Sequence, residues 1–248
     1  MLKIRDLKVK AWNKEILKWV NLDFDLGKNY LILGKNGSGK SSLVNFLMWN
    51  PNYEYLSWKL KVESWKEELD LLGLSPNERS KAWLFLSFQN VPEIEGINLW
   101  EYLRIIYNIH LKNRNPLAKD ISPFIFKRFV QKYLEELDIK EEFLTRDLNF
   151  SFSGWEKRKI ELLQAKLIEP SYIILDEIDS WLDLDAFKVV AKILQTMSTR
   201  DNSLIIITHQ FRILEYIDVD KVYVMKDGKI TEEWGKELIE RIGKKGFE

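Results

Sequence analysis

One stretch of sequence decides the fold, Tyr30-Leu31-Ile32-Leu33-Gly34-Lys35-Asn36-Gly37-Ser38-Gly39-Lys40-Ser41. Its four leading residues form a short apolar run that ends at a glycine, which is typical of a buried strand. The residues that follow, Ser41–Trp49, have the periodicity of a helix. A glycine-rich turn with the pattern Gly-x4-Gly-Lys-Ser between a strand and a helix is a phosphate-binding loop of the Walker A type.

The chemistry expected of this loop is phosphate binding. Its glycines let backbone N–H groups approach a phosphate closely, and the start of the following helix adds a favourable dipole. In such loops the lysine, here Lys40, reaches the β- and γ-phosphates, and the hydroxyl of Ser41 holds Mg²⁺. The residues predicted to bind ATP here are Gly34, Lys35, Asn36, Gly37, Ser38, Gly39, Lys40, Ser41 and Ser42.

The elements on either side of the loop alternate between strand and helix. Strands are predicted at Leu2–Ala11, Ile16–Leu26, Ala82–Phe88, Tyr172–Leu175, Leu204–Thr208 and Val222–Met225. Helices are predicted at Leu99–Leu111, Pro123–Leu137 and Trp155–Ile168. This alternation predicts an α/β fold with a mostly parallel sheet. The N-terminal strands are expected to be antiparallel. The helical stretch from about residue 92 to 168 is interpreted as a lobe inserted into a single domain, residues 1–248.

A second chemical motif ends the strand Tyr172–Leu175, where Asp176 and Glu177 follow the apolar run. An acid pair at a strand end is common and weak by itself. Here it comes about 135 residues after the Walker A loop, as in Walker B motifs. Asp176 is predicted to support Mg²⁺ through water, and Glu177 to polarise the attacking water as a general base.

A third motif, Ser151-Phe152-Ser153-Gly154-Trp155-Glu156, precedes the helix that leads to this strand. It resembles the signature loop Ser-Gly-Gly-Glu of the ABC-type ATPases, with Trp155 in place of the second glycine. In that family the loop covers the γ-phosphate held by the opposite subunit, so two ATP molecules lie in a head-to-tail dimer. The resemblance implies this role for Ser153 and Gly154. The same residues also fit an ordinary helix cap, Ser153 with Glu156 three residues later, and both interpretations can hold together.

The family resemblance extends to further positions. Gln89 follows the Ala82–Phe88 run, where ABC proteins carry a glutamine that senses Mg²⁺. His209 matches the histidine that contacts the γ-phosphate, whereas the other histidine, His110, is interpreted as a surface or lobe-packing residue. Ala11 stands where many ABC proteins place an adenine-stacking aromatic. The resemblance implies catalytic roles for Glu177, His209 and Gln89, Mg²⁺ ligation by Ser41, Gln89 and Asp176, and a D-loop at Ser180-Trp181-Leu182-Asp183.

Within the ABC proteins, the chain resembles the SufC family of iron–sulfur cluster assembly ATPases over nearly its whole length. The segments that carry this resemblance lie outside the general motifs and are Leu74–Arg79, Leu84–Gly96, Leu182–Val190 and Ile207–Leu214. The resemblance implies a cytoplasmic ATPase, two copies of which bind a scaffold of SufB- and SufD-like proteins. ATP-driven closure of the two copies then remodels that scaffold.

Two alternatives remain open. The general motifs fit equally well the nucleotide-binding subunit of an ABC transporter, whose membrane subunits are separate chains. A third interpretation is a non-hydrolysing ABC-like subunit. It applies if tryptophan is the true residue at motif positions such as 155 and 181, where ABC proteins have glycine.

Composition limits the function classes. The 38 Lys and Arg residues balance 38 Asp and Glu residues, so a broad basic surface for nucleic acid is not expected. No apolar run approaches the roughly 18–20 residues of a membrane span, so no direct membrane insertion is expected, and the charged Met1–Asp6 segment does not resemble a signal peptide. The absence of cysteine excludes disulfides and thiolate metal ligands.

Tryptophan is unusually frequent relative to glycine, with 10 and 11 residues. Together the two types make up about 8% of the chain, close to the ~7% that glycine alone contributes to an average protein. Compared with the SufC pattern, tryptophan stands at usual or frequent glycine positions, among them Trp155 and Trp181; the others are Trp19, Trp49, Trp58, Trp65, Trp83 and Trp234, with Trp12 and Trp100 less clear. One hypothesis is that these codons are UGA, read as glycine in the source cell. The alternative is true tryptophan, through divergence or loss of activity.

Overall fold

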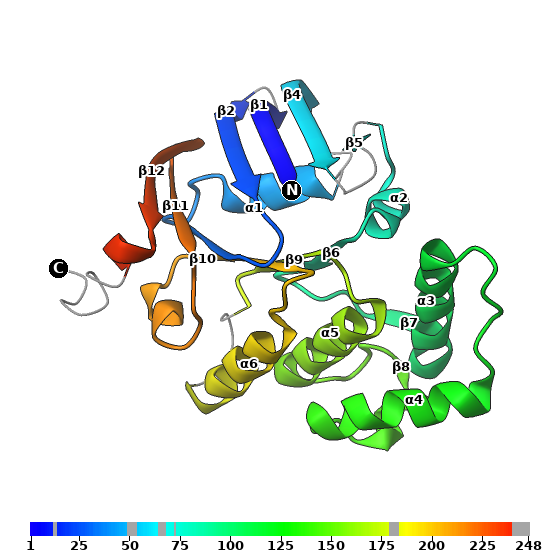
Figure 1. Ribbon diagram of the computed structural model, residues 1–248. Coiled ribbons are helices and arrows are strands. Elements are labelled where there is room, and N and C mark those ends of the chain that lie inside the picture. The colour runs from blue at the N-terminus through cyan, green and yellow to red at the C-terminus, as the bar shows by residue number, and fades with distance from the viewer. Residues whose placement is uncertain (12–13, 49–53, 64–67, 72, 179–183, 240–248) are drawn as a thin grey trace.

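The computed structural model describes residues 1–11, 14–48, 54–63, 68–71, 73–178 and 184–239 (Figure 1). Its centre is a sheet of six strands in the order β12-β11-β3-β10-β9-β6. Their bounds are β3 (Asn29–Leu33), β6 (Leu84–Ser87), β9 (Tyr172–Asp176), β10 (Ser203–Thr208), β11 (Lys221–Lys226) and β12 (Lys229–Gly235). Neighbouring strands are parallel except β12, which pairs antiparallel with β11 as a hairpin.

A second sheet is formed by the N-terminal part of the chain. It is antiparallel, in the order β2-β1-β4-β5, with bounds β1 (Leu2–Ala11), β2 (Lys14–Phe24), β4 (Glu54–Glu63) and β5 (Glu68–Asp70). Helix α1 (Lys40–Leu47) lies between this sheet and the central one (Figure 1). Helix α2 (Pro76–Lys81) leads into the edge strand β6.

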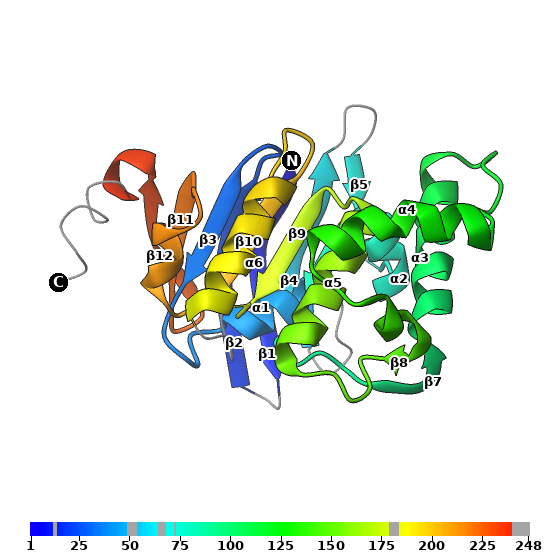
Figure 2. The same ribbon diagram turned by 90° about the horizontal axis from the view of Figure 1, so that it is seen from below.

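The opposite face of the central sheet is covered by α5 (Gly154–Ile168) and α6 (Leu184–Met197), as Figures 1 and 2 both show. Beside α5 lie α3 (Leu99–Arg114) and α4 (Pro123–Glu136), with the short pair β7 (Ile94–Asn98) and β8 (Asp147–Leu148). Two 3-10 turns, η1 (Glu141–Thr145) and η2 (Phe211–Glu215), complete the described elements. The predicted α/β class, with a mostly parallel sheet, antiparallel N-terminal strands and a helical lobe, is confirmed.

Strand β3 shows why the predicted apolar run has no polar position. All five of its residues are buried, because successive side chains point to opposite faces and both faces are covered. Leu31 and Leu33 join the core shared with α3, α5 and α6, whereas Tyr30 and Ile32 join the core beneath the N-terminal sheet. The Walker A loop therefore begins from a strand that is fixed on both sides.

The lobe elements α3, α4 and α5 fall within the range 92–168 predicted for the insertion. We propose that residues 1–248 form a single domain and that the lobe of residues 92–168 is an insertion within it. His110 on α3 is a packing residue: it is 6% exposed, and burial lowers its pKa to about 4, helped by the charges of Arg114 and Lys81. In the part of the chain described here, no helix is long and apolar enough to cross a bilayer.

Candidate functional site

The predicted site residues converge at one edge of the central sheet. Strands β3, β6, β9 and β10 run parallel, so their carboxyl ends meet there. Ligands of open α/β sheets bind outside these strand ends. The residues at these ends are Gly34 after β3, Gln89 after β6, Asp176 and Glu177 at β9, and His209 after β10.

The Walker A loop turns directly into α1, whose first residue is Lys40. The N-cap, Gly39, has φ of 111°, which L side chains rarely adopt. A Cβ there would also lie 2.8 Å from Cδ2 of Leu17. Only glycine fits, and the N–H groups of the first turn of α1 are left available for an anion.

Lys40 is held inside the loop. Its side chain is buried at 3% exposure, and Nζ donates to the carbonyl oxygens of Gly34, at 2.7 Å, and Lys35, at 3.1 Å. The ammonium group is therefore fixed where a phosphate bound by the loop would lie.

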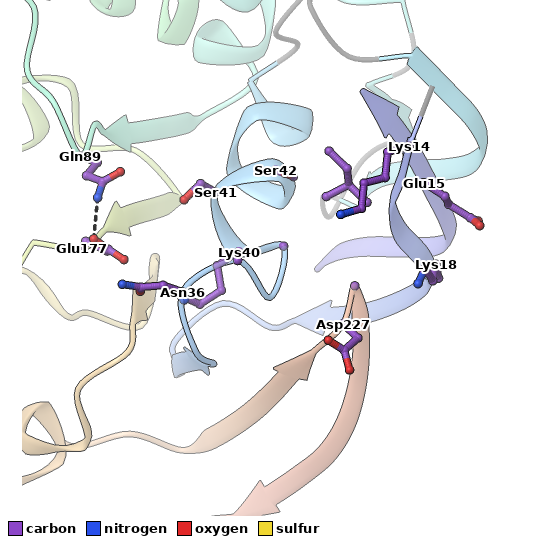
Figure 3. Close-up of a pocket in the computed structure, with 14 residues that line it drawn as sticks. Lys14, Glu15, Lys18, Asn36, Lys40, Ser41, Ser42, Gln89, Glu177 and Asp227 are labelled. Atoms are coloured by element: carbon purple, nitrogen blue, oxygen red, sulfur yellow. Dashed lines mark hydrogen bonds between the residues drawn. The ribbon is translucent and has the colours of Figure 1, made fainter. Parts of the chain in front are cut away.

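A cavity of about 850 Å³ opens beside the loop (Figure 3). Asn36, Lys40, Ser41, Gln89 and Glu177 all line it, together with Gly37, Gly39 and Ser42. The remaining loop residues, Gly34, Lys35 and Ser38, line an adjoining cavity of about 770 Å³, together with His209.

The far wall of the first cavity was not foreseen from the sequence. Lys14, Glu15 and Lys18 of β2 lie across the loop from Gln89 and Glu177, and Asp227 comes from the turn between β11 and β12 (Figure 3). The β2 segment was predicted only as a strand. Charged residues on an edge strand are also typical of solvent exposure, so the sequence carried no separate signal for this wall.

Three predicted catalytic side chains are in contact. Gln89 Nε2 donates to Glu177 Oε2 at 2.6 Å, and His209 Nδ1 lies 3.5 Å from Glu177 Oε1. Glu177 is 8% exposed, and its own N–H donates to the carbonyl oxygen of Ile207 at 2.8 Å. The carboxylate is thus held between the ends of β6 and β10, at the wall of the cavity.

Asp176 has the surroundings expected of a group that supports a cation. It is 5% exposed. Its pKa is raised to about 6, mainly by burial and secondly by the negative charge of Glu177. Its Oδ1 is buried without a hydrogen-bond partner. The described side chains include no cluster of three acidic or histidine ligands. Mg²⁺ fits here with water and phosphate oxygens as further ligands, which is its usual mode.

The signature residues lie apart from the cavity. Ser153 caps α5: its hydroxyl accepts from Glu156 N, and Glu156 Oε2 accepts from Ser153 N at 2.8 Å. Ser153 and Gly154 are exposed, and neither lines the cavity. The capping interpretation is therefore correct, and the contact with a partner's phosphate stays a prediction. The indole of Trp155 is half-buried against the core, with Lys159 Nζ 5.1 Å from its ring.

A buried network of charged side chains joins α5 to residues 87–89, and it was not predicted from the sequence. Arg158 Nη1 donates to Glu161 Oε2 at 2.7 Å, to Ser87 Oγ and to Phe88 O, and Nη2 donates to Gln89 O. Glu161 in turn accepts from Ser87 Oγ and from Phe88 N. Arg158 and Glu161 are three residues apart on a helix, a spacing that suggests an exposed ion pair. Only their burial, at 3–4% exposure, shows that they form an internal network. Helix α5, which begins at the signature loop, therefore holds the backbone of Phe88 and Gln89 in place through these hydrogen bonds.

Two predictions concern parts of the chain that are not described. The D-loop, with Trp181, lies outside the described residues, as does the side chain of Ala11. The roles assigned to them stay predictions.

Comparison with known proteins agrees with this geometry. Residues 17–180 match the family model described as ABC transporter. The whole chain is 36% identical to "Iron-sulfur cluster assembly protein SufC" of Plasmodium falciparum, covering 70% of that protein. It is 38% identical to "Probable ATP-dependent transporter slr0075" of Synechocystis, covering 94% of it. It is also 38% identical to "Vegetative protein 296" of Bacillus subtilis, covering 92%.

Solved structures share the fold. A dimeric bacterial ABC transporter cassette matches 95% of this chain and 98% of its own, with a TM-score of 0.77 at 18% identity. A post-hydrolysis cassette bound to ADP and Pi matches the same shares with a TM-score of 0.75, also at 18% identity. The fold, the full-length relatives and the matched family model lead to one conclusion: the chain belongs to the ABC transporter ATPase family, as an ATPase of the ABC type and a homologue of SufC.

Proposed function

We propose that this chain hydrolyses ATP in a site completed by a second copy, and so drives conformational change in an iron–sulfur cluster scaffold. The observation that carries the hydrolysis is the meeting of Lys40, Ser41, Gln89 and Glu177 on one cavity, with Asp176 adjacent to Glu177 at the end of β9. Gly34–Ser42 bind the phosphates. Ser41, Gln89 and Asp176 hold Mg²⁺, which offsets the phosphate charge when bound.

The residues of the chain divide the reaction between them. Lys40, whose ammonium group is held at the loop by Gly34 O and Lys35 O, binds the β- and γ-phosphate oxygens. Water attacks the γ-phosphorus while Glu177 accepts its proton, and the bond to the ADP oxygen breaks. Gln89 and His209 hold the Glu177 carboxylate in place and contact the water and the γ-phosphate.

Ser153 and Gly154 complete the site from a second copy. They are exposed at the start of α5 and lie outside the cavity of their own chain. A helix N-terminus is a suitable partner for a phosphate. ATP therefore holds two copies together in a head-to-tail dimer.

The scaffold assignment is supported by the full-length likeness to SufC. The partners in this proposal are SufB- and SufD-like proteins, in the cytoplasm. Affinity purification of the chain from its own cells tests it: soluble SufB- and SufD-like proteins are expected to co-purify. An integral membrane partner in their place contradicts the proposal.

The second candidate, the nucleotide-binding subunit of a transporter, is favoured by the name of the Synechocystis relative. Recovery of a membrane partner in the same purification supports this candidate. A non-hydrolysing subunit is the third candidate. It predicts no phosphate release from the chain with glycine at positions 155 and 181, even when the partners are present.

A further inference from the structure

Backbone conformation singles out two tryptophans. Nine described residues other than glycine have positive φ, and seven of them are Asp, Asn, Ser or Glu; the other two are Trp19, at 57°, and Trp83, at 71°. None of the phenylalanines or tyrosines in the described ranges shares this conformation. Bulky residues there are genuine outliers, whereas small polar residues reach it through local hydrogen bonds. The anomaly is confined to the residue type that is over-abundant in this glycine-poor chain.

Trp19 lies in a β-bulge. Val20 pairs with Leu7 and Leu17 with Val9, so Lys18 and Trp19 together oppose Lys8 alone. In one common bulge type the extra residue is a left-handed glycine. The indole is 57% exposed, with Lys8 Nζ 3.5 Å above its ring. The backbone therefore has the form that glycine takes, and the core does not need the indole.

Trp83 lies just past the end of α2, where the C-cap is Ala82. Its N–H donates to Ser80 O at 3.0 Å, and its own carbonyl accepts from Tyr172 N at 3.0 Å. The first residue beyond a helix C-cap is very often a left-handed glycine. Both tryptophans thus occupy positions for which glycine is the preferred residue, in two unrelated kinds of local structure.

We propose that residues 19 and 83 are glycine in the protein as its own cell makes it, encoded by UGA. One genetic code reads UGA as tryptophan and another reads it as glycine. Glycines and tryptophans together amount to an ordinary glycine content. Where the same codon specifies residue 155, the signature loop regains its second glycine.

Other tryptophans provide the contrast. Trp100, on α3, packs its ring 4.9 Å from that of Phe126. Trp234, on β12, stacks on Phe211, and its Nε1 donates to Glu232 at 2.8 Å. Both have negative φ, so their backbone gives no reason for glycine at either position. Ring contacts do not make this distinction, because the Trp83 ring also lies 6.4 Å from that of His110 and 5.9 Å from Arg114 Cζ.

The bulge also contributes a residue to the wall of the first cavity. That this cavity binds nucleotide rests on the proposed function. Lys18, the other bulge residue, lines that cavity, and its N–H donates to Gly228 O at 2.8 Å. Gly228 belongs to the turn that supplies Asp227 to the cavity. Glycine at 19 stabilises the bulge and so the placement of Lys18.

Peptide mass spectrometry of the protein isolated from its own cells is the direct test. Glycine at residues 19 and 83 is expected, and tryptophan at either position overturns the proposal. This readout does not depend on ATPase activity, so its failure is separate from failure of the proposed function.

A second test uses recombinant chain with tryptophan at all ten positions. Trp19→Gly and Trp83→Gly are each expected to raise the midpoint of thermal unfolding by about 2–4 °C, because each relieves one left-handed residue. The matched controls Trp100→Gly and Trp234→Gly are expected to lower it, because each removes a ring that packs on an aromatic partner. A fall with Trp19→Gly and Trp83→Gly as large as in the controls overturns the proposal.

Discussion

The Walker half of the site and its signature half differ in how they are held. Lys40, Asp176 and Glu177 are at most 8% exposed, and hydrogen bonds within the chain hold the side chains of Lys40 and Glu177. Ser153 and Gly154 are exposed, and only the cap of α5 organises them. The first half is preorganised within one chain, whereas the second is an exposed helix end that, in the proposed function, contacts the ATP of a partner copy. Changes in the Walker half should therefore affect each copy alone, and changes in the signature half should act only when two copies meet.

The largest expected effect lies in the Walker half. Glu177→Gln keeps the size of the side chain and its place beside Gln89 but removes the base, so hydrolysis should fall by about 10²–10⁴-fold. ATP binding should be retained, because Lys40 and the loop are untouched. Phosphate release and fluorescent-nucleotide titration measure the two quantities.

Glu237→Gln serves as the control for this change, since Glu237 is exposed and outside the cavity. Its phosphate release should match that of the unaltered chain. Retention of turnover by Glu177→Gln would assign the base to another group.

The next largest effect tests the link between the two halves. Arg158→Met leaves Glu161 buried without its cation, although burial already raises the pKa of that carboxyl. Removing one member of a buried pair costs roughly 3–5 kcal/mol of the free energy of unfolding. Urea unfolding measures this loss. Lys157→Met, one residue away, breaks an ion pair with the exposed Glu93 and should cost far less stability, because exposed pairs contribute little.

The double variant Arg158→Met with Glu161→Leu separates stability from coupling. Replacing both charges should recover most of the free energy of unfolding. Turnover should be reduced in both the single and the double variant, because the carbonyl oxygens of Phe88 and Gln89 have lost their donor. If turnover recovers together with stability, the network is structural and does not couple the halves.

The two halves also differ in how far the sequence could predict them. The Walker residues follow strands that are buried on both faces, and a continuous apolar run such as Leu31-Ile32-Leu33 specifies a buried strand without help from distant residues. Bounds of β1, β3, β9 and α5 were accordingly predicted to within a residue. Strands β4, β5, β7 and β8 were missed, because strands of mixed polarity, whether inside a sheet as β4 is or at its edge, depend on their partners. The Arg158 network was missed for the same reason: burial of a charge is decided by the segment that packs on it.

A smaller effect concerns the lobe that carries the signature helix. His110 has its pKa lowered to about 4 in the fold, whereas the unfolded value is 6.5. The unfolded chain therefore binds more protons between these values, and stability is lost as pH falls from about 6.5 towards 4. The loss over this range is on the order of 3 kcal/mol. Its cause is burial, and Nδ1 has no hydrogen-bond partner.

Urea unfolding at several pH values measures this slope, with His110→Gln as the comparison. The unaltered chain should lose stability relative to His110→Gln over this range. Parallel curves for the two proteins would show that His110 does not titrate in this window.

The smallest expected effect on stability distinguishes the two roles of Ser153. Ser153→Ala removes the cap and should cost about 1 kcal/mol, whereas Ser153→Asp keeps an acceptor for Glu156 N and should cost almost nothing. Dimerisation should show the reverse order. Aspartate places a negative charge where the partner's γ-phosphate would lie, so ATP-dependent dimerisation should be abolished by Ser153→Asp and only weakened by Ser153→Ala. Light scattering with ATP in the Glu177→Gln background measures it. Normal ATP-dependent dimerisation of Ser153→Asp would mean that Ser153 acts only as the cap of α5 and that the signature residues do not belong to the ATP site.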